Sequence, residues 1–79
     1  MKPIEFVEQF LILNGFEKID TNTFLLNNCI INIEKEYYSL SFGDNDEITE
    51  ITSENLNIYW LIGYLTYYNI IDRNYKLTN

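Results

Sequence analysis

Residues 23–42 read TFLLNNCIINIEKEYYSLSF, and apolar side chains occupy alternate positions through most of this stretch. Alternation with a period of two is typical of β-strands that bury only one face. The alternating apolar residues are Phe24 and Leu26, then Cys29, Ile31 and Ile33, then Tyr38, Leu40 and Phe42. The positions between them are mostly polar, so we predict three strands whose apolar face needs a cover.

Short connections separate the predicted strands. Residues 27–28 (Asn-Asn) suit a two-residue hairpin because asparagine tolerates a positive φ, and residues 35–36 (Lys-Glu) offer a second, weaker turn. Short links make consecutive strands antiparallel neighbours. Residues 43–46 form a turn cluster, after which Ile48 and Ile51 add either a short fourth strand or an irregular crossing. The sequence therefore predicts an antiparallel meander of three or four strands.

A helix is predicted before the strands, where apolar residues recur at three- and four-residue spacing. These residues are Phe6, Val7, Phe10, Leu11 and Leu13. Pro3 suits the first helical position. Asn14 and Gly15 supply a left-handed stop, and Phe16 can fold back on the last turn as in a Schellman motif. We therefore expect this helix to run from about Pro3 to about Leu13.

A second helix is predicted after the strands, from about Glu54 to about Ile71, because the apolar run is too long for a strand. The alternate positions at its start, Leu56, Ile58, Trp60 and Ile62, also fit a strand, but the off-phase Tyr59 and Leu61 are apolar as well, which favours the helix. Thr52 or Ser53 can cap the helix, with Glu54 in its first turn. The complete prediction is a single α+β domain, residues 1–79, of αβββα order with both helices packed on one face of the sheet.

The second helix carries two apolar arcs when it is wound at about 100° per residue. One arc is aliphatic and contains Ile58, Leu61, Ile62 and Leu65. The other is rich in aromatic residues and contains Leu56, Trp60, Tyr64, Tyr67, Tyr68 and Ile71. Either the first helix and the sheet cover both arcs, or Trp60, Tyr64, Tyr67 and Tyr68 form a contact surface for a partner or a second copy. Gly63 costs about 1 kcal/mol relative to alanine, so we expect a close helix or strand crossing there.

The charge of the chain is segregated. Twelve Asp and Glu oppose five Lys and Arg, a net charge of −7, and no basic residue lies between Lys35 and Arg73. This acidity argues against direct binding of nucleic acid, which requires a basic surface. The densest acidic segment contains Asp44, Asp46, Glu47, Glu50 and Glu54. It is either a solvated turn that keeps the protein soluble or an acidic patch that docks on a basic protein surface.

The residues that most enzymes and metal sites require are scarce. Histidine is absent, and with it the commonest general base and metal ligand. Cys29 is the only cysteine and alternates with Ile31, which favours a buried strand thiol in a reducing compartment over a nucleophile. Residues 44–47 fail as a calcium loop because Ile48 and Thr49 stand where an oxygen ligand and a glycine are needed. We expect no enzyme, no cofactor and no metal, although residue types alone leave carboxylate-pair catalysis open.

These features predict a small acidic, non-enzymatic binding protein, an inhibitor or modulator that occupies the basic, nucleic-acid-handling surface of a partner protein. In size and charge it resembles small inhibitors from phages and other mobile elements, including anti-CRISPR proteins. The alternative is a homo-oligomeric assembly protein, for example a homodimer, that uses the aromatic arc. Glu5 and Glu8 do not suit a signal peptide and no apolar run reaches about 20 residues, so we expect no membrane contact and a cytoplasmic location, in a bacterium or a virus-infected host cell.

Overall fold

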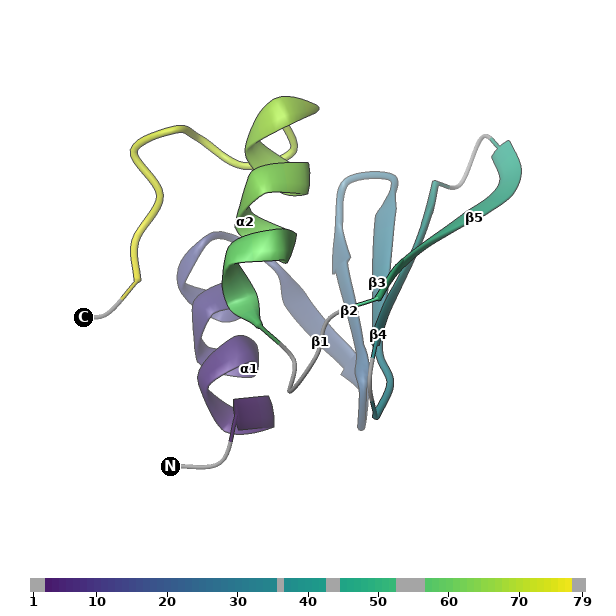
Figure 1. The fold of residues 1–79 in the computed structure, drawn as a ribbon, viewed down its shortest axis with the longest axis horizontal. Coiled ribbons are helices and arrows are strands. Elements are labelled where there is room, and N and C mark those ends of the chain that lie inside the picture. The colour runs from purple at the N-terminus through teal and green to yellow at the C-terminus, as the bar shows by residue number, and fades with distance from the viewer. Residues whose placement is uncertain (1–2, 36, 43–44, 53–56, 78–79) are drawn as a thin grey trace.

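Two helices lie on one face of a five-stranded antiparallel sheet in the computed structural model, which describes residues 3–35, 37–42, 45–52 and 57–77 (Figure 1). The strands follow one another across the sheet in chain order. The elements are α1 (Pro3–Leu13), β1 (Glu17–Asp20), β2 (Thr23–Leu26), β3 (Cys29–Ile33), β4 (Tyr37–Phe42), β5 (Asn45–Thr52) and α2 (Ile58–Tyr67). The predicted α+β class and the antiparallel meander between two helices are confirmed.

The sheet has one strand more than the sequence pattern predicts. β1 pairs with β2 through Glu17 opposite Leu25 and Lys18 opposite Phe24. All four residues of β1 are exposed, so the strand has no buried face and leaves no alternation of apolar residues in the sequence. At the other edge, β5 pairs with β4 and contains Ile48 and Ile51, which confirms the optional fourth strand.

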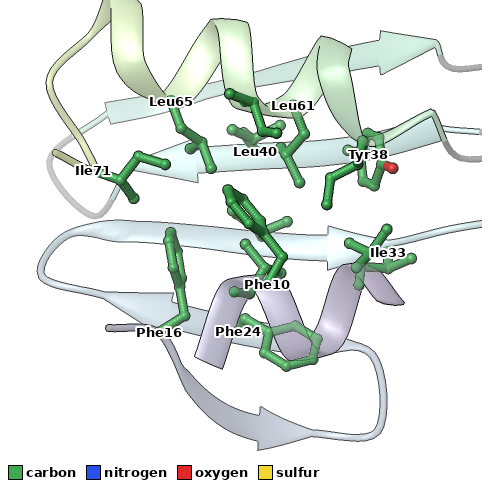
Figure 2. Packing of buried hydrophobic residues seen from close by; sticks show 14 of the residues in the cluster. Phe10, Phe16, Phe24, Ile33, Tyr38, Leu40, Leu61, Leu65 and Ile71 are labelled. Atoms are coloured by element: carbon green, nitrogen blue, oxygen red, sulfur yellow. The ribbon is translucent and has the colours of Figure 1, made fainter. Parts of the chain in front are cut away.

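The core lies between the helices and the apolar face of β2, β3 and β4. In the register of these strands, Phe24 is opposite Ile31, and Ile31 is opposite Leu40, and all three side chains are buried. Figure 2 shows Phe10 of α1 and Leu61 of α2 pointing into this layer from the covering helices. The buried residues of α2 are Ile58, Leu61, Ile62 and Leu65. The predicted aliphatic arc is therefore the face that packs on the core.

α1 has the predicted bounds and the predicted end. Gly15 has a φ of 101°, and its N–H donates to the Ile12 carbonyl at 3.2 Å. The Phe16 N–H donates to the Leu11 carbonyl at 2.9 Å, and the Phe16 side chain is buried. These two bonds are those of a Schellman motif, which turns the chain from the helix into β1.

α2 begins later than predicted. Its N-cap is Asn57, whose side-chain oxygen accepts a hydrogen bond from the Tyr59 N–H at 2.9 Å. Thr52, one of the predicted caps, instead ends β5, and Ser53 and Glu54 lie outside the described residues. The propensity of Thr52 to cap a helix is overridden because the residue is paired opposite Tyr37 in the sheet.

α2 also ends earlier than predicted. Asn69 has a φ of 57°, and its N–H donates to the Thr66 carbonyl at 3.1 Å. The Ile70 N–H donates to the Leu65 carbonyl at 2.8 Å, which completes a second Schellman motif. Ile71 therefore lies beyond the helix, where the turned chain buries it in the core instead of leaving it on the aromatic arc.

Gly15→Ala should lower the free energy of unfolding by about 1 to 2 kcal/mol, because an L-residue with a Cβ is strained at a positive φ. A Cβ at Gly15 would come no closer than 3.5 Å to Leu26, an ordinary contact, so the loss arises from the backbone conformation. Urea unfolding measures it. Gly15→Asn is the control and should lose less, since asparagine tolerates this region; an equal loss in both variants would contradict the explanation.

Candidate functional site

The outward side of α2 carries a cluster of exposed aromatic side chains. Tyr59, Trp60, Tyr67 and Tyr68 are 56% to 77% exposed, and Tyr64 is half-buried. Together with Gly63, these residues line an open hollow of about 540 Å³. We call this set the aromatic surface; its members are Tyr59, Trp60, Gly63, Tyr64, Tyr67 and Tyr68.

The periodicity of the helix brings these residues together. Residues four apart are neighbours on a helix, so Tyr64 and Tyr68 form a row with Trp60. The ring centroids of Tyr64 and Tyr68 are 4.7 Å apart, and those of Tyr67 and Tyr68 are 4.9 Å apart with the rings at 80°. Such ring contacts restrict the side chains before any partner binds, which reduces the conformational entropy lost on binding.

Gly63 lies open within the aromatic surface. It is exposed, and beyond its own helix a Cβ at this position would meet no atom of the described residues within 4 Å. The expectation of a close crossing at Gly63 is therefore wrong within the part of the chain that the structure describes. The reason is that α2 packs on the core through its aliphatic arc, which leaves the side that contains Gly63 open. The helix-propensity cost of Gly63, about 1 kcal/mol, has no compensation from packing there.

All four aromatic residues singled out from the sequence, Trp60, Tyr64, Tyr67 and Tyr68, fall within this one surface. Tyr59 also belongs to it but is not on the predicted arc, because winding the helix at about 100° per residue places Tyr59 between the aromatic and the aliphatic arcs. Its signal in the sequence is the spacing of four residues to Gly63 and eight to Tyr67. Leu56, also predicted on the arc, lies outside the described residues.

The acidic segment is only partly covered by the structure. Asp44 and Glu54 lie outside the described residues. For Asp46, Glu47 and Glu50, the structure describes the position in the strand but not the side chain. These three residues belong to β5, so their expected place in or beside a solvated turn is corrected to an edge strand. The pairing skips Asp46 and Glu47, because Phe42 is opposite Asn45 and the next residue, Ser41, is opposite Ile48. Acidic residues at an irregularity of an edge strand also discourage sheet-to-sheet aggregation.

Cys29 is buried in the core, as its alternation with Ile31 predicts. Burial raises the pKa of the Cys29 thiol from 9.0 to about 11, because desolvation disfavours the thiolate. A protonated, inaccessible thiol is a poor nucleophile. In the described part of the chain, no three His, Cys, Asp or Glu side chains gather as metal ligands would, and no helix has the length and apolar character needed to cross a bilayer.

No protein-family model, curated protein or solved structure matches this chain. The surfaces of the molecule itself are therefore the basis for proposing a function.

Native Cys29 should react with a thiol reagent at pH 8 at least about a hundredfold more slowly than the same thiol in denaturant, because two pKa units reduce the thiolate fraction that much. The higher pKa of the folded state also means that the stability contributed by the protonated thiol is complete below pH 9 and is lost as the pH rises toward 11. Absorbance assays with and without guanidinium measure the two rates. Rapid labelling of the native protein would contradict the buried placement.

Tyr67→Ala should change the free energy of unfolding of the dilute protein by less than about 0.5 kcal/mol, because the exposed ring contributes little to the core. Leu61→Ala, on the opposite side of the same helix, should cost about 2 to 5 kcal/mol. Urea unfolding compares the two variants. Similar losses in both would show that the aromatic ring belongs to the core.

Proposed function

We propose that this protein is a small acidic, non-enzymatic binding protein that contacts other protein molecules through the aromatic surface of α2. The observation that carries the proposal is the set of four large aromatic side chains left exposed around Gly63 on one short helix. Tyrosine and tryptophan supply large contact area at low entropic cost and are enriched at interface hot spots. Residues 57–71 contain no charged residue, and depletion of charge is typical of the centre of an interface.

The chemistry of the hollow supports binding over catalysis. Its described lining consists of phenol rings, an indole and a glycine, without a carboxylate, an amine or a thiol. Phenol and indole groups are weak general acids and bases. The one thiol of the chain is buried elsewhere, in β3.

The acidic half of the chain supports a partner with a basic surface. All seven net negative charges arise between residues 36 and 72, where seven Asp and Glu occur and no Lys or Arg. Such a region attracts and orients a positively charged protein over about a Debye length. Basic surfaces of this kind are common on proteins that handle nucleic acid. We therefore propose an inhibitor or modulator of such a protein, of the sort that phages and mobile elements encode, anti-CRISPR proteins included.

Reversing Asp46, Glu47 and Glu50 to lysine tests the role of the acidic residues. Association with a partner captured from a bacterial lysate should slow about tenfold or more at low salt and lose most of its salt dependence. Biolayer interferometry at several salt concentrations measures the rates. The matched control reverses Glu5, Glu17 and Glu34, exposed acids from the first half, and should leave the association rate nearly unchanged. Equal effects of both triple reversals would show that only net charge matters.

Trp60→Ala and Tyr67→Ala test the role of the aromatic surface separately. Each should weaken binding to the captured protein by about 2 kcal/mol or more, roughly thirtyfold, mainly through faster dissociation. The control is Ile12→Ala, which shortens a side chain on α1 that is also about half exposed, 53%, and should bind like the parent. Parent-like binding of the captured protein together with parent-like self-association in both aromatic variants would overturn the proposed role of the aromatic surface.

A homo-oligomeric assembly protein is the second candidate. The uncharged character of residues 57–71 favours it, since two copies of an acidic chain can approach most easily where neither is charged.

A further inference from the structure

Gly63 lies near the midpoint of α2, with Tyr59 four residues before it and Tyr67 four residues after it. A Cβ built at Gly63 would have no neighbour within 4 Å among the described residues, so packing within this part of the chain does not require a glycine there. A glycine at the middle of a helix allows a second helix to approach closely. The aromatic residues on either side are placed to flank such a helix.

The charge of α2 restricts what that second helix can be. Residues 57–71 carry no charge although the whole chain carries −7, so a basic partner would find no counter-charge along this helix. A second copy of the chain would present the same uncharged surface. The charge match at this surface is therefore better for a second copy than for a basic protein.

We propose that a second copy of this chain covers the aromatic surface, with the two α2 helices crossing antiparallel at Gly63 about a twofold axis. The inference rests on the proposed function in one respect, that the aromatic surface is a protein contact. A twofold contact is self-complementary, so residues at equal distances on either side of the axis meet. Tyr59 of one copy then packs beside Tyr67 of the second copy, and the acidic β5 edges stay available to a basic partner.

The area available agrees with a stable dimer. An aromatic side chain offers about 150 to 250 Å² of surface, so four that are 56% to 77% exposed contribute roughly 500 Å² in each copy. Two copies together would bury roughly 1,000 Å² from these side chains, where specific interfaces begin. The rest of the contact adds to this area.

The crossing also gives a reason for glycine. Packed helices lie about 8 to 10 Å apart, and each Cα is about 2.3 Å from its helix axis, so the facing Cα atoms lie roughly 4 to 5 Å apart. A larger side chain at residue 63 of both copies would hold the two helices apart. The aromatic rings that flank residue 63 would then lose contact with the rings of the second copy.

Sedimentation equilibrium over a range of concentrations tests the dimer. We expect a reversible monomer–dimer equilibrium, weakened at least tenfold in Gly63→Gln, which keeps good helix propensity and should fold normally by circular dichroism. Ile12→Gln, an equally polar change at an exposed site on α1, is the control and should dimerise like the parent.

Disulfide cross-linking tests the crossing point. Gly63→Cys should form an intermolecular disulfide under mild oxidation, since the expected Cα separation is within disulfide range. Tyr67→Cys should not, because the two copies of residue 67 would lie about 12 Å apart along the helices. Native Cys29 should not interfere, because it is buried.

A parent protein that stays monomeric at high concentration would overturn the second-copy inference. So would a dimer that Tyr67→Cys cross-links and Gly63→Cys does not. Neither result removes the proposed function, which fails instead if Trp60→Ala and Tyr67→Ala match the parent both in self-association and in binding a captured partner. A monomer that loses this partner in both alanine variants would keep the aromatic surface as a docking site and assign it to that partner.

Discussion

Burial of one face of the β2–β4 meander is the constraint on which the rest of the structure depends. The row formed by Phe24, Ile31 and Leu40 crosses three strands, and in the described part of the chain the two helices, with Ile71 beyond α2, cover it. α1 contributes Phe10 to this layer and α2 contributes Leu61 (Figure 2). Each helix therefore packs its apolar side against the sheet, and the residues on its other side are left exposed.

This constraint leads directly to the aromatic surface. Once the aliphatic arc of α2 packs on the sheet, the rings of Trp60 and Tyr67 cannot enter the same core, so they stay outside. The caps at Asn57 and Asn69 limit the helix to the length that carries these rings. The glycine at its middle then leaves a hollow among them, at a cost of about 1 kcal/mol in helix propensity. A helix with this outer side is better suited to contact a protein than to contact water.

The aromatic surface and the acidic residues belong to separate parts of the molecule. The aromatic surface lies in an uncharged stretch, residues 57–71, whereas the acidic positions Asp46, Glu47 and Glu50 belong to the edge strand β5. Uncharged aromatic area controls how slowly a complex dissociates, and long-range charge controls how fast it forms. A small binding protein can thus tune the two properties with separate residues, and a dimer would present two acidic edges to one partner.

The sequence by itself determined the end of α1 and the apolar faces of β2 to β4, features whose signals lie within a few neighbouring residues; the equally local ends of α2 at Asn57 and Asn69 were not predicted. The Schellman end of α1 at Gly15 needs only one positive φ and two nearby hydrogen bonds, and the alternation in residues 23–42 specifies which strand faces are apolar. Likewise, four aromatic residues of the site could be selected from helical spacing. Only the tertiary structure decided that Glu17–Asp20 pairs as a strand, that Thr52 joins the sheet instead of capping α2, and that Gly63 faces open space. These outcomes depend on which distant segments of the chain pack together. The periodicity of a segment does not record which strand it pairs with, or whether a distant segment covers it.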